Sequence, residues 1–345
     1  MGKSHAPRTV LVLAALTLAA CAGAAPSAHA QAPAASAAAS QPSVAASATK
    51  PAAPAPPRDV AAGAVLGAFP HDVILVLDVA SLRSHPVGRN LGPMIASMPQ
   101  WRDLLRGVVR DPVREIDWVY VTGPSLNNTS KDGILVHHQL APAAIEDAID
   151  KLHQRSAQVN AFDAHVLGVK ATIGTFDRAS RVLLRAEPYV LAVVPPDSAE
   201  SVAKILVGAH VTTPVTTGET LRLAVHAPHA ELAMVPAEVH DAVVVVVARP
   251  DGGLDVAGEG ACDDEAAAVR AEDELHALLS RYDNFIVRVM TRNLLNAIHI
   301  QHEGSKLHLR LAATREQVET VLGLLASVLG ASIDDAHQPQ RGVVP

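Results

Sequence analysis

Aromatic side chains are scarce in this chain: Phe, Trp and Tyr make up only 3% of its 345 residues. Sites that stack sugar rings or nucleic acid bases rely on such side chains, so the scarcity disfavours both. Basic residues are also in the minority, because 28 Lys and Arg face 35 Asp and Glu and leave a net charge of −7. The chain therefore has no basic excess for nucleic acid binding, and Val, Leu, Ile and Ala must fill its core.

Cysteine is nearly absent, with Cys21 and Cys262 as its two occurrences. The pair excludes a disulfide framework once Cys21 is modified or removed. We expect Cys262 to be a small buried residue at a helix start, with a reactive thiol as the less favoured alternative.

Strong catalytic motifs are missing as well. The sequence holds no Gly-x-Ser-x-Gly, His-Glu-x-x-His, Gly-Lys-Ser/Thr or Cys-x-x-Cys pattern. Gly258-Glu259-Gly260 lacks a third glycine, and residues 251–255 lack the later glutamate of a calcium loop and are typical of a hairpin turn. We therefore predict no cofactor and no enzymatic activity.

The N-terminus has the pattern of an export signal. Lys3 and Arg8 precede an apolar run over residues 10–20 that is too short to span a bilayer. Leu18-Ala19-Ala20-Cys21 resembles the lipobox of bacterial lipoproteins. The resemblance covers the signal only. It implies that residues 1–20 are removed and that Cys21 is acylated.

Two destinations follow from the N-terminus. Ala22 is not the Asp that retains bacterial lipoproteins in the inner membrane, so the resemblance implies the periplasmic face of the outer membrane. A rival cleavage site, Ala28-His29-Ala30, would instead release a soluble periplasmic or secreted protein that begins at Gln31. The lipobox is favoured because Cys21 directly follows the apolar run.

Composition divides the rest of the chain. Residues 21–59 combine the lipidated Cys with an Ala, Pro and Ser-rich stretch that is typical of a disordered linker. We expect a first α+β half over residues 60–213, a second over 219–334 and a disordered tail over 335–345. The sequence leaves open whether the halves are one domain or two.

The predicted fold class is α+β, with antiparallel β-hairpins packed under helices on one side. Four strand-turn-strand-helix units recur and make two similar halves. The expected strand pairs are 117–122 with 133–139, 181–185 with 189–194, 242–249 with 254–260, and 296–302 with 307–312. Other expected elements are strands at 71–79, 165–173 and 220–226, a helical stretch at 285–295, and an apolar helical stripe from Leu91 to Trp101.

Helix starts and one hairpin register are predicted in detail. Asp197-x-x-Glu200 and Thr314-x-x-Gln317 have the capping-box pattern. A two-residue turn at Gly304-Ser305 pairs Glu303 with Lys306 and Ile298 with Leu311. This register places the Ile and Leu residues on one face and His299, His308 and the charged residues on the other, which a slip by one would scramble.

The 17 histidines are the one unusual chemical feature. His137 and His138 are adjacent in a strand and so point to opposite faces. His299 and His308 share the polar face of the last hairpin and are weak candidates for a metal site. Because a zinc site normally has three or four ligands and Arg310 lies opposite His299, we predict no metal there.

Two polar clusters, residues 127–132 and 263–265, could contact a partner, although a solvated loop and a helix N-terminus explain them as well. We therefore expect a non-catalytic binding or structural module, anchored to the membrane by lipid, with an envelope protein as its possible partner. The alternative is a periplasmic enzyme or metal-binding protein with a cryptic His-containing site.

Overall fold

The computed structural model describes residues 58–88, 91–92, 111–126, 129–155, 162–176 and 179–329. The signal, Cys21, the linker, the C-terminal tail and most of the stripe from Leu91 to Trp101 lie outside the described residues. No described helix has the length and apolar character needed to cross a membrane.

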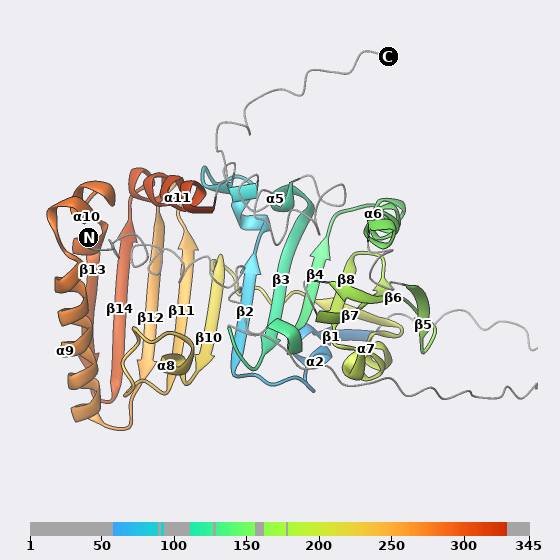
Figure 1. The fold of residues 1–345 in the computed structure, drawn as a ribbon, viewed down its shortest axis with the longest axis horizontal. Helices are drawn as coiled ribbons and strands as arrows, with labels where there is room; N and C mark the ends of the chain where they lie inside the picture. Colours follow the sequence, from blue (N-terminus) through green and yellow to red (C-terminus); the bar gives the residue numbers. More distant parts are fainter. Residues whose placement is uncertain are drawn as a thin grey trace, which may run out of the picture.

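One sheet of twelve strands dominates the structure (Figure 1). Every neighbouring pair in it is antiparallel. Its strands, in order across the sheet, are β13 (Ile298–Glu303), β14 (Lys306–Ala313), β12 (Leu254–Ala261), β11 (Asp241–Ala248), β10 (Leu221–His226), β2 (Val73–Asp78), β3 (Ile116–Gly123), β4 (Gly133–His138), β8 (Val190–Val194), β7 (Ala179–Glu187), β6 (Val169–Phe176) and β5 (Phe162–Val166).

Helices and short strands surround this sheet and confirm the predicted α+β class. The α-helices are α2 (Ala62–Val65), α5 (Pro112–Glu115), α6 (Pro142–Arg155), α7 (Ala199–Leu206), α8 (Pro228–Glu231), α9 (Glu265–Tyr282), α10 (Phe285–Met290) and α11 (Arg315–Leu329). The 3-10 turns are η2 (Ala80–Leu82), η3 (Thr129–Lys131), η5 (Pro196–Ser198) and η6 (Leu294–Ala297). A separate parallel pair joins β1 (Arg58–Ala61) to β9 (Ala209–Thr212).

Both predicted halves contribute to the same sheet. The order β2-β3-β4-β8-β7 on one side has the same chain sequence as β10-β11-β12-β14-β13 on the other. The two series meet where β2 pairs with β10, with Leu75 opposite Leu223. The common order is a fact of topology, and an internal duplication of the sequence stays a prediction.

The last hairpin has the register that the sequence predicts. Glu303 pairs with Lys306, and each following pair matches as far as Ile298 with Leu311. Gly304 has φ of 58°, the left-handed conformation that glycine adopts without strain. Ile298, Ile300 and Leu307 are buried against α9, whereas His299, Gln301 and Arg310 are exposed on the other face.

The expected single strand over residues 165–173 is wrong. The chain instead turns at Leu167 and Gly168, both with positive φ, and forms the hairpin of β5 and β6. The apolar residues Leu167, Val169, Ala171 and Ile173 nevertheless alternate without interruption from the turn into β6. Periodicity alone therefore did not reveal the break.

Of the two capping boxes that the sequence predicts, one is confirmed and one is wrong. Thr314 and Gln317 form the reciprocal box, with Gln317 N donating to Thr314 Oγ1 at 3.3 Å and Thr314 N to Gln317 Oε1 at 2.8 Å. The box predicted at Asp197 is wrong, because η5 occupies Pro196–Ser198 and α7 begins only at Ala199, with no side-chain cap. Two prolines before Asp197 favour this tighter entry.

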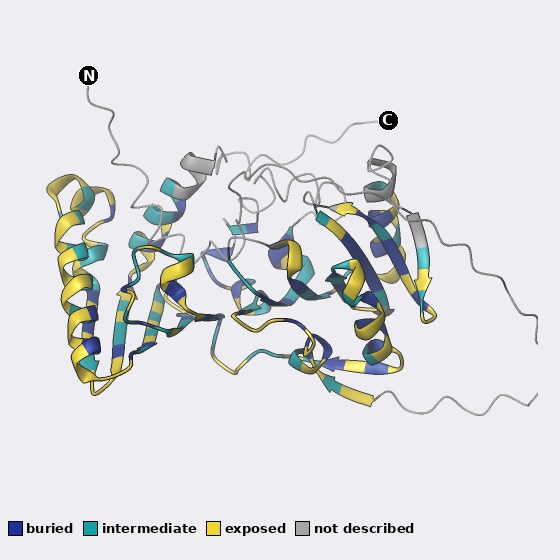
Figure 2. Cartoon of the chain, turned by 60° about the horizontal axis from the view of Figure 1, so that its bottom comes forward, coloured by how far each residue is buried: buried dark blue, intermediate teal, exposed yellow. Residues whose placement is uncertain are grey.

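Apolar cores lie on both faces of the sheet, which corrects the expectation of helices on one side. α9 covers the face that carries Ile300 and Leu307. At the other end, α2 and α7 cover the face that carries Tyr120 and Leu135. The pairings from β14 to β3 place these two sets on opposite faces, because side chains alternate along a strand. Figure 2 shows buried residues of α9 on its inner side.

Candidate binding surface

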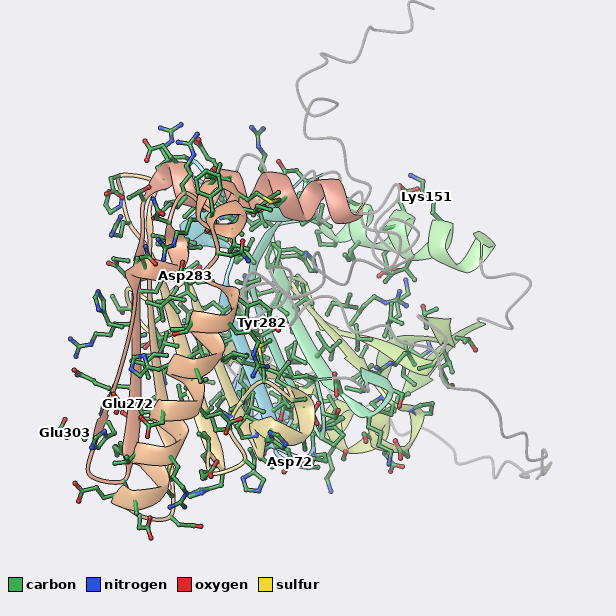
Figure 3. All side chains as sticks on the ribbon, turned by 60° about the vertical axis from the view of Figure 1, so that its left-hand side comes forward. Asp72, Lys151, Glu272, Tyr282, Asp283 and Glu303 are labelled. Carbon is green, nitrogen blue, oxygen red and sulfur yellow. The ribbon has the colours of Figure 1, made fainter. Side chains whose placement is uncertain are left out.

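The short helix α10 lies at the β13 end of the sheet, directly after α9 (Figure 1). Asn284 caps it, with its side-chain oxygen accepting from Val287 N at 3.1 Å. Asp283 accepts from Arg288 at 2.5 and 2.6 Å, and Figure 3 labels Asp283 at the junction of the two helices. Thr291 is buried and donates to the Val287 carbonyl at 2.7 Å. Because Thr291 is buried and Val287 is half-buried, this side of the helix faces the protein.

The opposite side of α10 presents unburied apolar side chains. Phe285 is 80% exposed, Ile286 67%, Val289 61% and Met290 43%. Residues at spacings of one, four and five share one broad face of a helix. Since burying one such side chain stabilises a protein by roughly 1.5–3 kcal/mol, this face leaves a favourable interaction unmade. We call Phe285, Ile286, Val289 and Met290 the α10 face.

Arginines surround the α10 face. Arg281, Arg288 and Arg292 lie between Ser280 and Leu294, where Asp283 is the one acidic residue. Glu316, at the start of α11, lies close enough to Arg292 for its pKa to be lowered by that charge, after larger effects of hydrogen bonds to the backbone and Thr314. The segment is therefore locally positive in a chain of net charge −7.

An open depression adjoins the face. It is lined by Phe285, Arg288, Val289, Arg292 and Asn293. Arg292 and Asn293 both have positive φ, 52° and 60°, as the chain turns from α10 into η6. The combination of apolar walls and guanidinium groups suits a ligand with an apolar body and an anionic end.

The histidines that the sequence nominates for metal do not converge with other ligands. His299 pairs with Arg310 across the hairpin, and His308 lies 4.0 Å from Glu303. Across the described ranges, no group of three His, Cys, Asp or Glu residues could hold a metal ion.

We therefore expect calorimetry of the metal-free protein with zinc or copper at neutral pH to give only weak, nonspecific heats. A single imidazole beside an arginine offers a cation too few ligands. A stoichiometric submicromolar site that His299→Ala or His308→Ala abolishes would contradict this, with His229→Ala as the matched control.

A second group of histidines ties α9 to the sheet. Glu272 on α9 accepts from the backbone N of His302 at 3.0 Å, and the ring of His302 bonds the same carboxylate. His276 Nε2 lies 3.4 Å from the other oxygen of Glu272. The hydrogen bond from His302 is the main cause that lowers the pKa of Glu272. The His302 contacts therefore tie α9 to β13, whereas His276 lies on α9 itself, and Figure 3 labels Glu272 on α9.

The most connected acid lies elsewhere, on β3. Asp117 accepts from Arg83 Nη2 at 2.5 Å, His137 Nδ1 at 2.8 Å and Gln139 Nε2 at 2.9 Å. Burial alone would raise its pKa, but the bonds from Arg83 and His137 outweigh it and lower the pKa. His137 also stacks on Trp118, with ring centroids 5.5 Å apart. Each of these groups bonds to or stacks on another member of the cluster, so the cluster has a structural role. We call it the hub around Asp117.

Asp132 is the most unusual acid of the described chain. Its side chain is buried, and its Oδ1 has no hydrogen-bond partner. Burial raises its pKa to about 7, against the lowering effect of the Arg181 charge. A Cβ on Gly123 would lie 1.9 Å from Asp132 Oδ1, so only glycine fits opposite the carboxyl.

The remaining sequence candidates take structural positions. Asp264 caps α9 by accepting from Ala267 N at 2.7 Å, as expected of a helix N-terminus. In the loop that holds residues 127–132, Glu231 of α8 accepts from Ser125 Oγ at 2.9 Å and Leu126 N at 3.0 Å, while Asn127 and Asn128 lie outside the described residues. Cys262 is buried, as expected, and burial together with nearby acids raises the pKa of its thiol.

Comparison with known proteins gives little. No protein-family profile matches the chain, and no curated protein matches it. One solved structure, crystal form I of the protein TP0453, is similar with a TM-score of 0.43 and 14% identity, over 75% of this chain and 96% of that chain. A likeness this weak carries no argument about function.

The α10 face was not recognised from the sequence. The six residues of α10, Phe-Ile-Val-Arg-Val-Met, have the pattern of an ordinary apolar helical stretch within residues 285–295. A run of fewer than two turns does not show which side faces the core. The one available signal was the concentration of three arginines around it.

Proposed function

We propose that this protein is an exported, lipid-anchored, non-catalytic module that works by binding at the periplasmic face of the outer membrane. The observation that carries the binding role is the α10 face, where four large apolar side chains remain unburied beside arginines. The anchor rests on the resemblance of residues 18–21 to a lipobox.

The chain between anchor and fold supports this role. From Cys21 to Pro57 a flexible chain has a typical end-to-end distance of roughly 35 Å, about a domain's width. Such a tether keeps the folded module concentrated near the membrane and raises the rate at which it meets a fixed partner there. An enzyme acting on a diffusing substrate would gain nothing from it.

Cys21→Ala tests the anchor. We expect the protein to move from the membrane pellet to the soluble fraction, or to remain unprocessed, because several acyl chains at ~0.8 kcal/mol per CH₂ are lost. Cys262→Ala is the matched control and should leave the pellet fraction unchanged, since this thiol is buried in the fold. A mature N-terminus at Gln31 in mass spectrometry would contradict the anchored form and leave a soluble exported protein.

A further inference from the structure

The α10 face is too small to be a protein interface of standard size. A stable interface takes about 20–30 residues from each partner, whereas α10 has six residues. A bilayer has no such requirement, because a few apolar side chains can enter its headgroup boundary singly. The size of the face therefore favours a lipid surface over a folded partner.

The charges around the face also favour a lipid surface. Arg281, Arg288 and Arg292 are exposed, and Asp283 neutralises only Arg288 directly. Apolar side chains rimmed by arginine are typical of elements that lie in the interface of membranes with anionic lipids. The aliphatic stems of the arginines can lie along the apolar boundary while their guanidinium groups reach phosphate.

We propose that α10 is a membrane-contacting element, which seats Phe285, Ile286 and Val289 in the headgroup boundary of an anionic bilayer while Arg292 binds lipid phosphate. This rests on the proposed function, because the tether holds the module within reach of the membrane. It adds a second attachment point and so sets which side of the sheet faces the bilayer. The β13 end of the sheet lies toward the lipid, and the β5 end away from it.

The experiment uses the mature chain, residues 21–345, carrying Cys21→Ala, so that neither an acyl chain nor the apolar signal contributes. Binding is measured by co-sedimentation with vesicles of phosphatidylethanolamine and phosphatidylglycerol, and with phosphatidylcholine vesicles. We expect binding to the anionic vesicles that Phe285→Asp with Val289→Asp weakens by about tenfold or more, and that high salt weakens partly.

The matched control is Leu167→Asp with Val207→Asp, two apolar residues that are 52% and 53% exposed on other elements. It should bind as the parent does, and thermal melts of both double variants should equal that of the parent. Phe285→Trp gives a second readout. Its fluorescence should shift to the blue and be quenched by brominated lipid, whereas Leu167→Trp should show neither effect.

Three results would overturn the inference. One is equal vesicle binding by the Phe285→Asp, Val289→Asp variant and its parent, and another is no vesicle binding by the parent. The third is a dimer in sedimentation equilibrium that this variant converts to monomer, which would assign the face to a second copy of the chain. Each is distinct from failure of the proposed function, which the fractionation of Cys21→Ala reports separately in cells.

Discussion

Replacing Asp132 by Asn is expected to stabilise the protein more at pH 8 than at pH 5. The folded protein holds the pKa of Asp132 at about 7, above the ordinary value of 3.8. Between these values the folded state binds more protons than the unfolded state, so the free energy of unfolding falls as pH rises and the loss is complete above pH 7.

The size of the effect follows from the shift. One pKa unit corresponds to about 1.4 kcal/mol, so the group costs the folded state at most about 4 kcal/mol at pH 8. This cost already includes the favourable charge of Arg181, whose hydrogen bond from Nη1 to the Asp132 carbonyl at 2.8 Å persists in the variant. An amide in place of the carboxyl has no charge to desolvate. The variant is therefore expected to recover between several tenths of a kcal/mol and most of that cost.

Urea unfolding at both pH values measures the difference. Asp273→Asn on exposed α9 is the control and should show no pH-dependent gain. An Asp132→Asn variant that loses stability equally at pH 5 and pH 8 would mean that the carboxylate is paired in solution and that its pKa is not raised.

Replacing Asp117 by Ala is expected to destabilise the protein by about 2–4 kcal/mol at neutral pH, because it leaves the Arg83 guanidinium without its carboxylate partner in a largely buried site. The carboxylate is 19% exposed and accepts from three side chains. Its pKa is lowered in the folded state, so its contribution is present above pH 3.8 and is lost as the pH falls through the lower folded value.

The control is Asp147→Ala, which removes an exposed pair with Lys151. Such pairs contribute about 0–1 kcal/mol. The free energies of unfolding of the two variants, measured in urea at pH 7, should therefore differ clearly. Similar, small losses for both would show that Asp117 is solvated and that the hub around it contributes nothing to stability.

Local sequence determined a good part of this fold. The register of β13 and β14 could be predicted because a two-residue turn at Gly304-Ser305 and strict alternation leave one pairing that separates Ile298 and Ile300 from the charged residues. The caps at Asp264 and Thr314 follow from contacts within three residues. The strand pair expected at 242–249 and 254–260 is the pair of β11 with β12.

Tertiary structure decided everything that depends on distant neighbours. Periodicity states that a strand has an apolar face but not which side of the sheet a helix will cover, so the two opposite cores could not be predicted. Asp132 is ordinary in sequence, and its pKa is raised because the fold buries it, against the lowering effect of the Arg181 charge. The α10 face is apolar in sequence like any core segment. It is a candidate binding surface because no described element packs over Phe285 and Val289, and burial is a property of the whole chain.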